Sequence, residues 1–293
     1  MEHKIFKSSD TNVMKFVFED KGIAVEAVLY RYESYKNRTV ICCSTQCGCP
    51  VGCSFCGTGK FFKRNLTADE IVEQIQTVLT YIDCDTLDIQ KFQIMFMSMG
   101  EPFLNYDNLE AAIRNLHTLY PNAQLLVSTS APKGCGGKIE RFAQLSQEID
   151  RCGLQFSVHE SNDWDRAQLI GSKTSELWEI GHLGRYWAKQ VGRKPYFNYC
   201  VHERNCSDKN VTELLENFDP TVWECTLSVI CEKDSTMQNA IESKLELIQG
   251  FAQKMTKAGY SIRVFNPAGQ DDIGGGCGQL WYFQEWLKRE NQQ

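Results

Sequence analysis

Short apolar runs and amphipathic segments alternate along most of this 293-residue chain. Each apolar run has the length of a buried strand, and each amphipathic segment carries its apolar residues at helical spacing. The expected strands span residues 39–42, 92–97, 125–129, 154–158, 196–201, 223–230 and 260–265. The repeat is roughly thirty residues, the size of a βαβ unit, so the pattern predicts an α/β protein with a parallel sheet. Six or so such units indicate a full or partial barrel, with its chemistry at the carboxyl ends of the strands.

Turn and cap signals place the other elements. Apolar bursts between Met14 and Tyr30 are interrupted by Lys21 and Gly22, which predicts a hairpin ahead of the first barrel strand. Thr67 to Glu70 reads Thr-Ala-Asp-Glu, a capping box that opens a helix. Further helices are expected through residues 109–116, 139–149 and 175–191.

Three of the fourteen cysteines, Cys49, Cys53 and Cys56, follow the spacing C-x3-C-x2-C. One turn of loop can aim three such thiolates at one centre, and soft sulfur ligands favour zinc or iron–sulfur chemistry over hard cations. A zinc site would usually show two separated ligand pairs, and the sequence has no second pair at that spacing. A cubane iron–sulfur cluster is therefore the favoured interpretation. The alternatives are a structural zinc site completed by Cys43 or Cys47, or cysteines that bind no metal.

Composition limits the class of protein. The chain is long for a disulfide framework and its first residues lack a signal-peptide apolar region, so a reduced, cytoplasmic protein is expected. No apolar run is long enough to cross a bilayer. The net charge of −6 argues against a generally basic surface, so a nucleic-acid partner would need a local patch. One candidate is the run from Lys60 to Arg64, where basic residues flank two phenylalanines; the alternative is an ordinary exposed loop end.

Several segments in addition to the cysteine motif resemble one family. The chain is similar to the radical S-adenosyl-L-methionine (SAM) superfamily and, within it, to the RlmN/Cfr-type RNA adenine methyltransferases. The segments that carry this resemblance, from about residue 8 onward and in the family's order, are 42–49 (Cys-Cys-Ser-Thr-Gln-Cys-Gly-Cys), 62–66 (Phe-Lys-Arg-Asn-Leu), 99–102 (Met-Gly-Glu-Pro) with 104–105, 128–130 (Ser-Thr-Ser), 157–159 (Ser-Val-His) with 162–163, and 271–280 (Asp-Asp-Ile-Gly-Gly-Gly-Cys-Gly-Gln-Leu).

The resemblance implies a partial (β/α)6 TIM-like barrel of the radical SAM type with a small N-terminal β-hairpin extension. Residues 1–37 would form the hairpin extension, 38–268 the barrel, and 269–293 a C-terminal segment that carries the methyl-carrier cysteine.

The resemblance also implies the cofactors and the residues that hold them. A 4Fe-4S cluster would bind Cys49, Cys53 and Cys56, and its remaining iron would bind SAM. The implied SAM contacts are Gly100, Glu101, Ser128, Ser157 and His159. Without the resemblance, Glu101 reads as an acid favoured at a helix N-terminus, and His159 as a hydrogen-bonded histidine at a strand end.

Three further residues have implied catalytic roles. Cys277 follows three glycines, which allow close backbone approach, and would accept a methyl group from one SAM. A second SAM would be cleaved to a 5′-deoxyadenosyl radical that takes a hydrogen from this methyl, and the carbon radical would add to adenine. Cys42 would then release the product through a disulfide bond with Cys277, and Glu26 would act as general base. Without the resemblance, these are a loop cysteine, a buried strand cysteine and a solvated strand carboxylate.

The chain departs from the family pattern in three places. The small helical domain that usually precedes the hairpin is expected to be absent, residues 178–194 match poorly, and residues 229–233 (Val-Ile-Cys-Glu-Lys) stand where the family has Pro-Trp-Asn-Pro. The expected function is methylation of an adenine sp² carbon in ribosomal or transfer RNA by two SAM molecules and a methyl-cysteine, with carbon 2 favoured over carbon 8. The alternatives are the same chemistry on a non-RNA or partner-delivered substrate, and a non-catalytic homologue that binds cluster and RNA. A flavodoxin or ferredoxin reductant, a monomeric state and no membrane association are expected.

Overall fold

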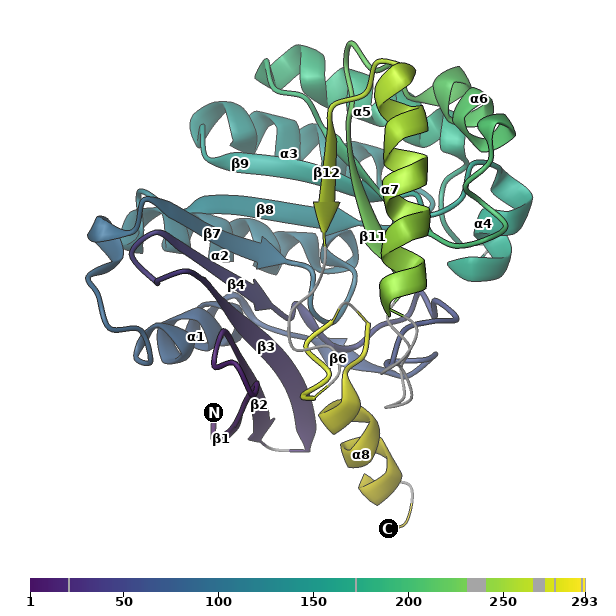
Figure 1. The fold of residues 1–293 in the computed structure, drawn as a ribbon. Coiled ribbons are helices and arrows are strands. Elements are labelled where there is room, and N and C mark those ends of the chain that lie inside the picture. Colours follow the sequence, from purple (N-terminus) through teal and green to yellow (C-terminus); the bar gives the residue numbers. More distant parts are fainter. Residues whose placement is uncertain are drawn as a thin grey trace.

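A single curved sheet runs through the computed structural model and organises the elements around it (Figure 1). The structure describes residues 1–20, 22–171, 173–230, 241–265, 272–276, 278–290 and 292, with the side chains of 241–243 left out. Within these residues the sheet has ten strands in the order β1-β2-β3-β4-β7-β8-β9-β10-β11-β12, and β5 and β6 form a separate hairpin.

The strands are β1 (His3–Lys7), β2 (Val13–Asp20), β3 (Ile23–Tyr32), β4 (Arg38–Cys43), β5 (Gln46–Gly48), β6 (Phe62–Asn65), β7 (Lys91–Phe96), β8 (Gln124–Thr129), β9 (Cys152–Ser157), β10 (Tyr196–Val201), β11 (Glu224–Val229) and β12 (Ile262–Phe265). The helices are α1 (Ala68–Leu79), α2 (Tyr106–Leu119), α3 (Gly136–Glu148), α4 (Asp163–Leu169), α5 (Leu177–Val191), α6 (Asp208–Asn217), α7 (Ile241–Lys257) and α8 (Trp281–Glu290), with short 3₁₀ turns at Thr86–Asp88 and Pro102–Asn105.

The parallel part of the sheet is the predicted barrel. β4 pairs in parallel with β7, and the parallel pairing continues through β12. The predicted hairpin is β2–β3, which continues the same sheet in antiparallel pairing through β4. The predicted α/β class and partial-barrel architecture are confirmed. The proposed boundaries after residues 37 and 268 stay predictions.

Side-chain alternation explains why helices cover one face of the parallel part of the sheet. Along β7, Phe92, Ile94 and Phe96 join the large apolar core beneath the helices. Gln93 and Met95 occupy the intervening positions and reach the opposite face. Figure 1 shows helices α1 to α3 and α5 to α7 on the outer side, so the inner face is left for a site.

Helix α1 begins where the sequence predicts it. Thr67 accepts a hydrogen bond from the backbone N–H of Glu70 at 3.2 Å, and the Glu70 carboxylate accepts one from the backbone N–H of Thr67 at 2.9 Å. The expected capping box is therefore confirmed. The short strand β1 and the seven-residue helix α4 were not predicted.

Helix α8 returns the end of the chain to its beginning (Figure 1). The rings of Phe6 and Tyr282 stack with centroids 3.6 Å apart. Arg289 forms an ion pair with Glu19 at 2.9 Å. In the described part of the chain, no helix has the length and apolar character needed to cross a membrane.

Candidate active site

The loop that carries the three motif cysteines is closed by the β5–β6 hairpin. The backbone N–H of Cys49 donates a hydrogen bond to the carbonyl of Phe61 at 2.7 Å. Just before it, Gly48 has a φ of 78°, and a Cβ there would lie 2.2 Å from the Phe61 carbonyl oxygen. Only glycine fits this crossing, so the sequence Gly-Cys fixes where the loop begins.

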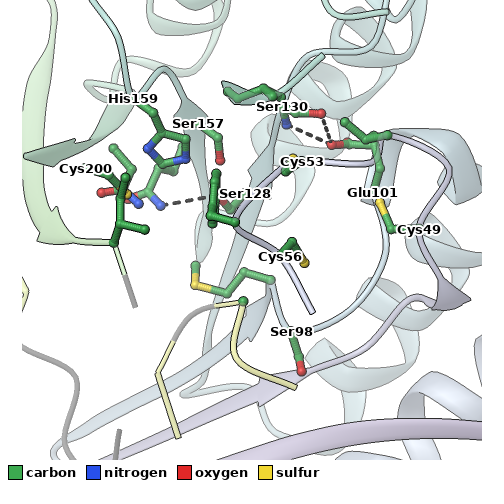
Figure 2. Close-up of a pocket in the computed structure, with 18 of the residues that line it drawn as sticks. Cys49, Cys53, Cys56, Ser98, Glu101, Ser128, Ser130, Ser157, His159 and Cys200 are labelled. Carbon is green, nitrogen blue, oxygen red and sulfur yellow. Dashed lines mark hydrogen bonds between the residues drawn. The ribbon is translucent and has the colours of Figure 1, made fainter. Parts of the chain in front are cut away.

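The thiols of Cys49, Cys53 and Cys56 line one pocket (Figure 2). Across the pocket lie residues from the carboxyl ends of β8, β9 and β10 and from the segment after β7, which is the edge where a barrel carries its chemistry. All five of the implied SAM contacts are among the lining residues, namely Gly100, Glu101, Ser128, Ser157 and His159. Segments from four different strands thus meet at the thiols.

The donor set fits an iron–sulfur cluster. Burial raises the pKa of the Cys49 thiol to about 12 and also raises the pKa of Cys53, and negative charge on neighbouring thiols and on Glu101 acts in the same direction. Three thiolates this close therefore need bound cations to remain ionised. No three His, Cys, Asp or Glu side chains in the described residues are arranged around a single metal ion. A cluster differs from a single ion in that each cysteine binds its own iron.

Glu101 is the most densely hydrogen-bonded carboxylate of the pocket. One oxygen accepts from the backbone N–H of Phe103 at 3.1 Å and the hydroxyl of Thr129 at 2.6 Å. The other accepts from the backbone N–H and the hydroxyl of Ser130, at 2.8 and 2.7 Å. Burial raises the pKa of Glu101, while these hydrogen bonds lower it. The side chain is 3% exposed, and its position is fixed from both oxygens.

Gly100 has a structural reason to be glycine. Its φ is 99°, and a Cβ would lie 2.7 Å from the Cβ of Gln46. The Gln46 side chain in turn accepts a hydrogen bond from the backbone N–H of Glu101 at 2.8 Å. The turn after β7 is therefore packed directly on the strand that leads into the cysteine loop.

His159 presents a neutral imidazole to the pocket. Burial lowers its pKa to about 3, and the positive charge of Arg166 acts in the same direction. Its Nδ1 is buried without a hydrogen-bond partner, and the ring stands edge-on to Phe55 at 5.6 Å between centroids. His159 also has a φ of 64°, an unfavourable conformation for a residue with a side chain. The interpretation of a hydrogen-bonded strand-end histidine therefore does not hold for Nδ1.

The sequence reasoning missed two residues that support the site, the pocket residue Ser130 and the buried Arg166 behind it. Ser130 holds Glu101, although Ser128 was the serine singled out in the same motif. Arg166, 2% exposed, donates to the backbone carbonyls of Ser130 at 2.8 Å and Ser157 at 3.0 Å. It ties the ends of β8 and β9 together. No local pattern marks Arg166, because its partners lie on separate strands.

Cys42 lies on the inner face of the sheet, in a small apolar cluster with Val28, Val40 and Ile273. It lines a cavity of about 320 Å³ that adjoins the thiol pocket, since Met97 lines both. None of the described cysteines forms a disulfide bond. Cys277 lies outside the described residues, so the implied bond between it and Cys42 stays a prediction.

Glu26 is fully buried, so the expectation of a solvated strand carboxylate does not hold. It pairs with Lys15 at 2.6 Å and accepts a hydrogen bond from the backbone N–H of Phe283 at 2.8 Å. Lys15 also donates to the carbonyl of Gly274 at 2.5 Å. The pair therefore anchors the segments on both sides of position 277. Lys15 is a charged residue within the apolar run of β2, and it was the sequence feature that could have indicated this buried pair.

The described neighbours of Cys277 contact the cysteine loop. The backbone N–H of Gly57 donates to the carbonyl of Gly278 at 2.6 Å. A Cβ on Gly278 would lie 3.5 Å from the Cα of Cys56. The C-terminal segment and the motif loop are thus held together at the pocket.

Known proteins with similar sequences share one name. No family model matches the chain. A probable dual-specificity RNA methyltransferase RlmN of Trichodesmium erythraeum is 32% identical over 279 residues, which covers 94% of this chain and 73% of the relative. The same-named protein of Heliobacterium modesticaldum is 31% identical over 271 residues, covering 88% of this chain and 67% of the relative.

A solved structure is also similar. The crystal structure of a radical SAM methyltransferase from Sphaerobacter thermophilus matches with a TM-score of 0.76 at 29% sequence identity. The match covers 94% of this chain and 79% of that chain.

Proposed function

The chain belongs to the RlmN family of RNA methyltransferases, and from this membership we propose that it methylates an sp² carbon of adenine in RNA by radical SAM chemistry. Ribosomal or transfer RNA is the proposed substrate, with carbon 2 favoured over carbon 8. The observation that carries the proposal is the single pocket that three motif cysteines share with Glu101 and His159.

The cofactors of this family are a 4Fe-4S cluster and SAM. Cys49, Cys53 and Cys56 would hold the cluster, and the segments around Gly100 and His159 would hold SAM beside it. When bound, the two together supply an electron, a methyl group and a radical. The protein's own contribution is to seat them in a buried pocket in which a neutral imidazole and a fixed carboxylate face the ligand.

Two cysteines carry the covalent part of the proposal. Cys277 holds the methyl group as a thioether, using one SAM, while a second SAM serves the radical step. Cys42, on the inner face of β4, forms a disulfide bond with Cys277, and this bond frees the methylated adenine from the carrier. Glu26 is the proposed general base of the same reaction. Its side chain pairs with Lys15 in an apolar interior.

Intact mass measurement tests the carrier role. We expect protein that is reconstituted anaerobically with iron and sulfide and supplied with SAM to gain one methyl group on Cys277. Cys277→Ala should lose the gain, whereas Cys84→Ala, a half-buried cysteine near a 3₁₀ turn, should retain it. A wild-type protein that never carries methyl on Cys277 would contradict the mechanism.

Nucleoside analysis separates the remaining alternatives. Digested RNA from cells with and without the gene should differ in 2-methyladenosine. A difference in 8-methyladenosine would instead assign carbon 8, and methylated Cys277 without any RNA difference would favour a non-RNA or partner-delivered substrate. A non-catalytic homologue would show neither product. The flavodoxin or ferredoxin reductant, the monomeric state and the cytoplasmic location remain predictions.

A further inference from the structure

Basic residues gather at the amino-terminal ends of the barrel strands, at the end of the inner face away from the thiol pocket. They come from the first residue of β4, the first residue of β7, the two residues that follow α5 and Gly192, and the second residue of β12. In chain order they are Arg38, Lys91, Arg193, Lys194 and Arg263, and we call them the basic rim.

The parallel register and the curvature of the sheet bring these residues together. Arg38 and Lys91 are direct partners in the pairing of β4 with β7. Lys91, Arg193, Lys194 and Arg263 line one cavity of about 220 Å³ on the inner face. Burial lowers the pKa of Arg38 and of Lys91, and the positive charge of Arg263 lowers both further. The rim is therefore a local concentration of positive charge in a chain whose net charge is −6.

In the described part of the chain, the rim cations are not paired with carboxylates. None of the ion pairs between described residues includes a rim residue. Arg38 donates instead to the Gln93 amide oxygen, and Arg263 to the Thr226 hydroxyl at 3.1 Å. Glu224 is also at this edge and interacts with Tyr196. Arg193 donates to the backbone carbonyls of Asp150 and Cys152, and Lys194 to that of Pro220 at 3.1 Å. Because these partners carry no charge, the net positive charge of the rim is not neutralised by an ion pair among the described residues.

Two aromatic rings lie under rim guanidinium groups. The Arg38 guanidinium carbon lies 4.2 Å from the centre of the Tyr32 ring, and that of Arg263 lies 4.9 Å from the centre of the Tyr196 ring. Cations interleaved with aromatic faces are what proteins use to hold a phosphate backbone and stack its bases. A small inorganic anion would not need the aromatic rings.

The rim opens into the cavity that contains Cys42. Arg38 and Arg263 line the cavity of about 320 Å³ together with Cys42 and Met97. Gln155 and Asn198 line both this cavity and the thiol pocket. A continuous inner surface therefore leads from the basic rim past Cys42 to the motif cysteines.

The other basic candidate, around the cysteine loop, has fewer available charges. Arg64 makes two hydrogen bonds to the Glu70 carboxylate, at 2.7 and 2.8 Å. Lys63 donates to the carbonyl of Gly22 at 2.5 Å and lies over the Trp286 ring. Phe62 remains 42% exposed. The loop is thus partly used for packing against the hairpin and α8.

We propose that the basic rim binds the phosphodiester backbone of a single-stranded RNA segment, so that the target base enters the Cys42 cavity from the amino-terminal end of the barrel. This inference rests on the proposed function. It adds where the RNA is held and which side chains hold it.

Salt-dependent RNA binding tests the rim. The probe is fluorescein-labelled oligoadenylate RNA, titrated by anisotropy with the cluster-loaded protein. The rim variant Lys91→Gln/Lys194→Gln/Arg263→Gln should lose tenfold or more in affinity. Its slope of log K against log salt should fall by about 2, because each phosphate contact on a single strand contributes about 0.7. The control Lys189→Gln/Lys209→Gln/Lys257→Gln removes the same charge from the helical face and should bind as the wild type does.

Crosslinking gives a second readout that does not depend on affinity. RNA that contains 4-thiouridine should crosslink to peptides with Tyr32 or Tyr196, as identified by mass spectrometry. Crosslinks confined to Phe61 and Phe62 would overturn the proposal in favour of the cysteine loop. Equal iron content and equal melting temperature show that the rim variant is folded.

The binding experiment distinguishes a failure of the rim assignment from a failure of the proposed function. If the wild type binds the RNA and the rim variant binds it with the same affinity and salt slope, the rim assignment is wrong while the proposed function stands. If the wild type does not bind RNA at any salt concentration and methylates none, the proposed function fails, and the rim proposal fails with it.

Discussion

Lys15 and Glu26 place two opposite charges in the apolar interior, at 1% and 0% side-chain exposure. Removing such groups from water costs several kcal/mol per ion, and their mutual attraction offsets that cost only when other hydrogen bonds complete the site. Here the additional partners are the Gly274 carbonyl and the backbone N–H of Phe283. The pair is therefore best understood as the fastening of the C-terminal segment, at a modest net gain in stability.

Removing only the lysine of this pair should lower the free energy of unfolding more than removing both charges does. Lys15→Met leaves the Glu26 carboxylate buried without its cation, so the free energy of unfolding should fall by about 3–5 kcal/mol. The double variant Lys15→Met/Glu26→Gln keeps an acceptor for Phe283 and should regain at least half of that loss. Urea unfolding followed by circular dichroism measures both values. A double variant as unstable as the single one would argue against an electrostatic origin.

The cysteine loop depends on one close approach between two backbone segments, at Gly48 and Phe61. β5 and β6 form a short hairpin whose register shifts between Cys47 and Gly48. Gly48 lies there against the Phe61 carbonyl, and the three motif cysteines follow within the same loop. The hairpin therefore fixes the start of the loop, while hydrogen bonds from Ser54 to the Leu169 carbonyl and from Gly57 to the Gly278 carbonyl hold the rest of it.

Two glycine variants separate backbone conformation from steric fit in this loop. Gly48 and Gly59 have φ values of 78° and 55°, so alanine should cost each about 1–2 kcal/mol for the left-handed conformation. A Cβ at position 48 would also lie 2.2 Å from a carbonyl oxygen, whereas nothing lies within 4 Å at position 59. Gly48→Ala should therefore bind clearly less iron after reconstitution than Gly59→Ala. Equal iron contents, measured by colorimetric assay, would show that the crossing does not position the thiols.

Elements were predictable from the sequence where local signals were strong. The strand–helix alternation, the hairpin at Gly22 and the capping box at Thr67 all follow from residues close together in the chain. β1 was missed because its five residues mix charged and apolar side chains without a clear period. The basic rim was missed for a different reason. Arg38 and Arg263 carry no local pattern, and only the curvature of the sheet brings β4 and β12 to the same cavity.

At the scale of the whole molecule, the C-terminal segment joins the hairpin to the cysteine loop. Phe283 is fully buried and has aromatic contacts with Phe61 at 5.9 Å and Trp286 at 5.5 Å between centroids. Arg289 reaches Glu19 on the hairpin. The inner face is thus closed by residues from both ends of the chain, and stability and site geometry are coupled through α8.

A buried contact of α8 should contribute much more to the free energy of unfolding than an exposed contact does. Phe283→Ala removes a ring from the packed interface and should lower the free energy of unfolding by about 3–5 kcal/mol. It should also speed amide hydrogen exchange in residues 49–61, because Phe61 loses its support. Arg289→Ala removes a surface ion pair and should cost about 0–1 kcal/mol with no change in that exchange. Unchanged exchange in Phe283→Ala would show that α8 and the loop are energetically independent.

The hydrogen bond between Glu26 and Phe283 joins residues 257 positions apart, and this separation has a consequence for biosynthesis. The hairpin and the cysteine loop leave the ribosome long before α8 does. During that interval the cysteine loop lacks the contact with Gly278 that the finished chain makes. The loop that carries the three motif cysteines is therefore more open during synthesis than in the finished chain.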